Sequence, residues 1–143
     1  MGWWFGRKKR EAEPEKPRAP SVLRVRGDVI ALICQSARAS HPREFGGVLR
    51  ADKEEIISEL LLLPGTVSGQ THAIFQLHML PIDFAVRGTV HSHPSGTPLP
   101  SEADLDLFRR FGRRHIIIGS PYNERSWRAY DGRGEPIRAE VVD

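Results

Sequence analysis

The sequence predicts a single α/β domain in which short strands outnumber helices, preceded by a separate N-terminal tail. A chain of 143 residues is long enough to bury a substantial core as one domain. Several apolar stretches have the length of buried strands, among them IISELLLL (56–63) and HIIIG (115–119). Two further stretches space their apolar residues as amphipathic helices do. Together these patterns predict an α/β architecture.

The composition narrows the class of protein. Hydrophobic residues make up 39% and charged residues 27% of the chain, as in ordinary soluble globular proteins. No apolar run approaches the ~18 residues of a membrane span. The opening MGWWFGRKKR lacks the apolar core and cleavage site of a secretory signal. The single Cys34 excludes an intramolecular disulfide and a cysteine-based zinc knuckle. A cytoplasmic protein is therefore expected.

Residues 1–20 carry the whole excess of positive charge. They contain six basic and three acidic residues, whereas residues 21–143 contain fifteen of each sign. The alternating charges and three prolines of KKREAEPEKPRAP predict a disordered tail. Its WWF triplet before RKKR could instead contact an anionic membrane or a partner protein, but a plain disordered tail is favoured. Because the domain itself is neutral, no nucleic-acid ligand is expected.

Two helices are predicted, and the regular pattern starts with the first of them at residues 28–41. Asp28 is its expected N-cap, and Pro42 ends it. Its apolar residues recur at helical spacing: Val29, Ile30, Ile33 and Ala37. The second helix is expected over residues 101–112, with Gly112 as its C-terminal stop. Its apolar face is expected to contain Leu105 and Phe108.

Strands are predicted for most of the remaining chain. The segments read as strands are 44–51, 54–64, 86–93, 115–121, 126–131 and 137–142. The segment HAIFQLHMLP (72–81) hints at a further strand, although a helix is an alternative. The turn-like ADK joins the first two strands, and DGRG (131–134) is typical of a hairpin turn before the last one.

The stretch HSHPSGTPLPSEAD combines two histidines with a Ser-x-x-Asp sequence across a short Pro-rich loop. Side chains alternate along an extended strand, so His91 and His93 should point to the same face. Two neighbouring imidazoles can hold Zn²⁺, and Asp104, one turn into the second helix, could supply a third ligand. Three protein ligands with one open position are typical of catalytic rather than structural zinc.

The alternative is a capped helix without a metal, because Ser101-x-x-Asp104 is also a close variant of a capping box. Capping alone gives no reason for the histidine pair, so the combination favours a metal site. Hydrolysis would also need a general base. Glu44 is a candidate because it directly precedes FGG, whose glycines allow close backbone approach. Sequence spacing alone does not place Glu44 near the histidines.

The chain resembles the JAMM (MPN+, JAB-domain) zinc metalloprotease family, whose motif it matches at every position: Glu44, His91, His93, Pro94, Ser101 and Asp104. Flanking segments such as GTVHSHPS, PSEADLDLF and FGRRHIIIG are similar to compact archaeal members. The similarity covers roughly residues 22–143. It implies a curved mixed β-sheet flanked by helices, of the cytidine-deaminase-like type, as one domain over 21–143.

The resemblance also implies a function. One catalytic zinc ion would be held by His91, His93, Asp104 and a water. Glu44 would be the general base, and Ser101 would hydrogen-bond the water or the developing oxyanion. The implied reaction hydrolyses the isopeptide bond between the C-terminal glycine of a ubiquitin-like small modifier and a protein lysine. Such conjugates would be the partners.

Three alternatives stay open at this point. The same chemistry could release the tail of a sulfur-carrier protein. A non-catalytic MPN scaffold is a second alternative, although such relatives typically lack the ligands. The RadC-like DNA-repair family also carries a His-x-His-Pro-Ser-Gly stretch, but the neutral domain disfavours DNA. The sequence does not specify the modifier or the oligomeric state, for which a homodimer is one alternative.

The other titratable residues near the motif are expected to serve packing or solubility. The histidines outside it are His41, His72, His78 and His115. His115 is expected to pack at the start of a strand, and Cys34 to be inert in an apolar helix. Glu102 and Asp106 lie about 200° from Asp104 around a helix, so they should face elsewhere.

Overall fold

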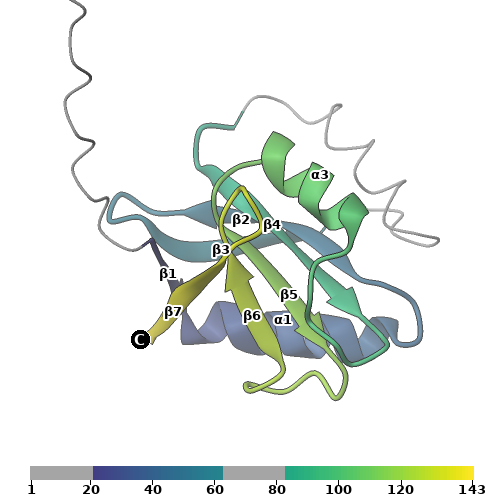
Figure 1. Cartoon of the computed structure of the whole chain (residues 1–143). Helices are drawn as coiled ribbons and strands as arrows, with labels where there is room; N and C mark the ends of the chain where they lie inside the picture. The colour runs from purple at the N-terminus through teal and green to yellow at the C-terminus, as the bar shows by residue number, and fades with distance from the viewer. Residues whose placement is uncertain (1–20, 63–82) are drawn as a thin grey trace, which may run out of the picture.

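The computed structural model describes residues 21–62 and 83–143 (Figure 1). The predicted disordered tail (1–20) and the segment 72–81 lie outside these residues. The elements in chain order are β1 (Val22–Arg26), α1 (Gly27–Ser40), β2 (Gly46–Ala51), β3 (Ile56–Leu62), β4 (Val86–His93), α3 (Glu102–Arg110), β5 (His115–Gly119), β6 (Trp127–Tyr130) and β7 (Pro136–Val142). Within the described ranges, no helix is long and apolar enough to cross a membrane.

The strands form a mixed sheet that curves until it closes. They pair in the order β1-β3-β2-β4-β5-β6-β7, and β7 returns to β1, so these strands make a closed barrel. β1 runs parallel to both of its neighbours, and β4 runs parallel to β5. The other pairs are antiparallel. The expected curved mixed sheet is therefore confirmed.

The two helices lie on opposite sides of the sheet, with α1 and α3 separated by the strands (Figure 1). Alternation along β5 produces this division because successive side chains of a strand point to opposite faces. Ile116 and Ile118 belong to the core cluster that contains Ile33 of α1. Ile117 instead packs in a second cluster with Phe108 of α3. Both helices thus bury their apolar faces against the same sheet.

The start of the domain differs from the sequence prediction. Strand β1 was not predicted, although its residues Leu23 and Val25 are fully buried between β3 and β7. The predicted N-cap at Asp28 is wrong, because β1 leads directly into α1 at Gly27 without a loop. Asp28 lies in the first helical turn and forms an ion pair with Arg26 at 2.7 Å. A carboxylate there still complements the helix dipole.

Most other boundaries agree to within two residues. β2 begins at Gly46, so Glu44 precedes this strand and does not start it. In α3, Ser101 is the N-cap and Gly112 lies just beyond the helix with φ +110°, as expected for a stop. The buried face of α3 includes Leu107 with Phe108, whereas Leu105 is half-buried.

Gly88 in β4 is expected to tolerate no side chain. A Cβ at this position would lie 1.5 Å from the carbonyl oxygen of Arg114, which is backbone and cannot rotate away. We predict that Gly88→Ala lowers the free energy of unfolding by about 3 kcal/mol or more, as measured by denaturant titration. Gly27→Ala is the matched control, because its nearest contact would be an ordinary 3.7 Å. Equal free energies of unfolding for the two variants would contradict the close packing of Gly88.

Candidate metal centre

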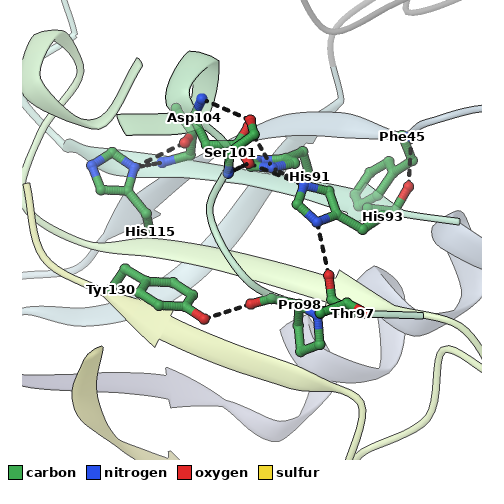
Figure 2. Close-up of polar contacts among 11 residues, drawn as sticks. Phe45, His91, His93, Thr97, Pro98, Ser101, Asp104, His115 and Tyr130 are labelled. Atoms are coloured by element: carbon green, nitrogen blue, oxygen red, sulfur yellow. Dashed lines mark hydrogen bonds and ion pairs between the residues drawn. The ribbon is translucent and has the colours of Figure 1, made fainter. Parts of the chain in front are cut away.

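Strand β4 and helix α3 bring three potential ligands together on one side of the sheet. His91 and His93 lie at the end of β4, where His91 is opposite Gly46 of β2 and Ile117 of β5. Asp104 reaches them from the first turn of α3, as Figure 2 shows. His91 and Asp104 are almost fully buried, and the side chain of His93 is 13% exposed. The pair of histidines therefore shares one face, as predicted.

The three side chains converge on one point. The Nε2 atoms of His91 and His93 are 3.1 Å apart. His91 Nε2 lies 3.0 Å from Oδ1 of Asp104, and His93 Nε2 lies 3.0 Å from its Oδ2. Among the described residues, these three form the group of His, Cys, Asp or Glu side chains that could hold a metal ion.

This geometry fits a zinc ion. Ligand atoms bonded to tetrahedral zinc at about 2.0–2.2 Å are about 3.3–3.6 Å apart, slightly more than the spacing found here. Two imidazole nitrogens and a carboxylate oxygen are also ligand types that zinc accepts. The donor set and its spacing therefore match a three-ligand site, with further coordination positions left for water or substrate.

The histidine tautomers support the same assignment. His93 Nδ1 lies 2.9 Å from the carbonyl of Thr97, so in the neutral ring Nδ1 donates to this carbonyl and the lone pair of Nε2 is available to a cation. Such a contact from the distal ring nitrogen orients metal-binding histidines. Nδ1 of His91 is buried without a hydrogen-bond partner in the described part of the chain. That atom can carry the ring proton when Nε2 binds a cation.

The metal and capping interpretations of Ser101 and Asp104 describe the same structure. The Oγ of Ser101 accepts from the backbone N–H of Asp104 at 3.2 Å, and Asp104 Oδ2 accepts from the N–H of Ser101 at 2.9 Å. This capping box fixes the rotation of the carboxylate that meets the histidines. A serine hydroxyl that accepts in a cap keeps its own hydrogen for donation.

The electrostatics of the cluster favour an ionised carboxylate. Burial alone would raise the pKa of Asp104, but hydrogen bonds with His91 and His93 outweigh it and hold that pKa well below its usual range. The hydrogen bond to Asp104 is the main cause that raises the pKa of His93, and burial opposes it. The negative charge of the Asp104 carboxylate thus lies beside two imidazole rings. A bound cation would take the place of the protons that these groups share.

Glu44 lies close enough for its charge to act on the metal site. Its negative charge is one of the smaller causes that raise the pKa of His93. The residue is half-buried and directly precedes Phe45, which is anchored to β4. Phe45 N–H donates to Ser92 Oγ at 2.7 Å, and Ser92 N–H donates to the Phe45 carbonyl at 2.9 Å. These contacts set the backbone position of Glu44 beside the two histidines.

Ser92 is therefore expected to act as a positioning residue for Glu44. Its side chain is fully buried on the face opposite to the histidines. We predict that Ser92→Ala leaves the Phe45 N–H unsatisfied and lowers the free energy of unfolding by about 1–3 kcal/mol. We also expect the hydrolysis that the JAMM resemblance implies to be several-fold slower at unchanged zinc content. Ser92→Thr retains the hydroxyl and should recover turnover, whereas equal turnover of the alanine variant and wild type would refute this role.

His115 forms a neutral layer below the site. Its ring stacks on Phe108 with centroids 4.1 Å apart, and Phe108 in turn contacts His91. The Oγ1 of Thr89 lies 2.8 Å from Nδ1 of His115, and Nε2 donates to the carbonyl of Gly112. Burial lowers the pKa of His115 from 6.5 to about 4. The expected packing role of His115 is confirmed.

This pKa predicts a loss of stability in mild acid. Between pH 6.5 and 4 the unfolded chain binds more protons at His115 than the folded chain, so its contribution to stability decreases as the pH falls. The expected loss is up to about 3 kcal/mol across that window. Denaturant unfolding of metal-free wild type and His115→Gln measures it, since the variant should show a flatter pH profile. If the stability of both proteins depended on pH in the same way, the lowered pKa of His115 would be contradicted.

The other titratable residues agree with the sequence prediction where the structure describes them. Glu102 and Asp106 are exposed on α3. His41 is exposed, and its Nδ1 lies 2.8 Å from the hydroxyl of Tyr122. Cys34 is buried, and burial raises the pKa of its thiol. His72 and His78 lie outside the described residues.

Three residues that support the site were not identified from the sequence. Ser92 positions Glu44 through Phe45, and the carbonyl of Thr97 orients the ring of His93. Tyr130 of β6 donates from its hydroxyl to the carbonyl of Pro98, in the loop that carries Thr97 (Figure 2). Two of these contacts use backbone carbonyls, which every residue has. Among these three residues, only Ser92 could have been identified from the sequence, because it lies between the two histidines.

Comparisons with known proteins agree with this geometry. The family model described as prokaryotic homologs of the JAB domain matches residues 27–130. A probable metalloprotease of Haloferax volcanii is 36% identical over 135 residues, which cover 88% of this chain and 83% of that protein.

Solved structures give the same result. A JAB1/MPN domain protein from Archaeoglobus fulgidus is 41% identical, with a TM-score of 0.70, over 85% of this chain and 100% of that one. A structure described as a JAMM metalloprotease-like zinc site in the proteasome and signalosome is 36% identical, with a TM-score of 0.67, over 86% and 100%. This chain therefore belongs to the JAB-domain (JAMM, MPN) family of metalloprotease-like proteins.

Proposed function

We propose that this protein is a zinc-dependent isopeptidase that removes a ubiquitin-like small modifier from protein lysines. The observation that carries the proposal is the convergence of His91, His93 and Asp104 within about 3 Å of one another, beside Glu44. A scaffold protein would need neither this ligand set nor a carboxylate next to it. The relative described as a probable metalloprotease supports proteolytic chemistry.

In this mechanism, His91, His93 and Asp104 would hold the zinc ion, which would supply polarisation of a carbonyl group and a lower pKa for a water molecule. Glu44 accepts the proton of the attacking water and transfers it to the departing lysine amine. The hydroxyl of Ser101 donates to the oxygen that becomes negative in the transition state, a contribution of about 10²–10³ in rate for comparable donors.

The proposed substrate class follows from the JAMM resemblance. A relative is described in connection with the proteasome and signalosome, which supports a modifier conjugate as substrate. An extended Gly-Gly tail could add alongside a strand near the site. The neutral charge of residues 21–143 supports a protein substrate over a nucleic acid. We place this activity in the cytoplasm, where protein conjugates would be available.

Two matched peptides test the proposal. One joins a Gly-Gly carboxyl to a lysine ε-amine, and the other joins the same Gly-Gly to an α-amine. We expect purified wild-type protein to bind about one zinc ion and to cleave the isopeptide, with loss of activity on chelation and recovery on zinc addition. Cleavage of the α-linked peptide alone would favour release of a sulfur-carrier tail. Zinc-loaded protein that cleaves neither peptide nor a modifier–lysine fusion would refute the proposal.

A further inference from the structure

A cleft remote from the metal centre lies at the opposite end of β4. Its volume is about 630 Å³. Four segments meet there: β1, the turn before β3, the beginning of β4 and the connection from α3 to β5. Arg87, at this end of β4, is four residues from His91, or about 13 Å along the strand. The cleft is therefore separate from the ligands of the metal.

The cleft concentrates positive charge within a neutral domain. Its lining residues include four arginines and two glutamates. Arg87 is neutralised by Glu55 through two hydrogen bonds of 2.7 and 2.8 Å. Arg24 and Arg113 are exposed and form no ion pair with any acidic residue of the described ranges. Their guanidinium groups are available to a ligand.

One wall of the cleft, which carries Arg87, Arg113 and Arg114, is preorganised. The carbonyl of Arg87 accepts from the backbone N–H groups of both Arg113 and Arg114, at 3.0 and 3.1 Å. Gly112 packs so closely that a Cβ would lie 2.2 Å from the same carbonyl oxygen. The start of β4 and the segment 112–114 are thus fixed to each other, which reduces the entropy lost on binding.

The lining chemistry points to a phosphate-bearing ligand with an apolar part. Guanidinium groups match the oxygens of phosphates with paired hydrogen bonds. Val22 and Val86 are partly exposed and add a small apolar surface to the lining. The volume falls within the range of about 300–1,000 Å³ typical of small-molecule sites and exceeds what a single inorganic ion needs.

We propose that this cleft binds a phosphoanion of the size and chemistry of a nucleoside diphosphate, with Arg24 and Arg113 contacting its phosphates. The apolar residues would contact its uncharged part. This site is independent of the proposed isopeptidase activity, because none of its residues belongs to the metal centre.

Calorimetric titration of the zinc-loaded full chain with ADP tests the proposal. We expect ADP to bind, inorganic phosphate to bind at least tenfold more weakly, and adenosine to show no binding. The affinity for ADP should fall as salt increases, because exposed charges are screened. The double variant R24A/R113A should bind ADP at least tenfold more weakly than wild type.

The matched control is R125A/R128A, which removes two exposed arginines elsewhere and changes the net charge equally. It should bind ADP within twofold of wild type, and circular dichroism should show that both variants are folded. Absence of ADP binding would overturn the proposal. Equal ADP binding by R24A/R113A and wild type would also overturn it, because the phosphates would then bind elsewhere, such as at the metal.

Discussion

Asp104→Asn is expected to lower the zinc affinity of the protein by more than about a hundredfold. Residues that only support a metal ligand typically contribute 10–100-fold, and Asp104 is placed to contact the ion itself. The asparagine oxygen can still accept from the N–H of Ser101, so the helix cap should persist. The variant therefore separates loss of the carboxylate charge from loss of the cap.

Zinc titration against a chromophoric chelator measures this affinity. Unfolding curves provide a second measurement, since zinc at a thousandfold its Kd should stabilise wild type by about 4 kcal/mol and the variant far less. Ser101→Ala is the control for capping, because it removes the side-chain acceptor and retains all three ligands. If Asp104→Asn bound zinc as tightly as wild type, Asp104 would act only in the helix cap and would not be a metal ligand.

Glu44→Gln is expected to retain zinc and to lose most of the turnover. A positioned general base typically contributes about 10²–10⁴ in rate, so a decrease of about a thousandfold in kcat is predicted. Glutamine keeps the size of the side chain but cannot accept the proton from water. The measurement is isopeptide cleavage under saturating zinc, together with the zinc content of the same preparation.

Glu102→Gln is the matched control, because this exposed glutamate lies on α3 two residues from Asp104 and faces away from the site. Its turnover should equal that of wild type. A Glu44→Gln variant with wild-type turnover would remove Glu44 from the mechanism. Loss of zinc in that variant would instead make Glu44 a contributor to the metal site.

The metal ligands could be predicted because they are local in sequence. His91 and His93 share a face on any extended strand, and the Ser101 cap fixes the helix that delivers Asp104. Ten residues of Pro-rich loop and helix start (94–103) separate His93 from Asp104, so few other arrangements are available. The structure confirms this proximity, with the ligand atoms about 3 Å apart.

The sequence prediction was wrong where the pairing partners of a strand lie far away along the chain. β1 has only five residues and alternates apolar with charged side chains, a weak signal for a strand. Its burial depends on parallel pairing with β3 and β7, which no local pattern specifies. Asp28 is not the N-cap for the same reason, since β1 continues directly into α1 and its last residue, Arg26, occupies the N-cap position.

By itself, the sequence determined the α/β class, the two described helices, and the donor set of His91, His93 and Asp104. Tertiary structure alone decided that Glu44 comes near this site, because Phe45 forms a hydrogen bond with Ser92, 47 positions further along the chain. It also decided that four chain segments, three of which carry arginines, form a cleft at the other end of β4. Local patterns fix which side chains share a face, whereas sheet pairing fixes which faces and ends meet.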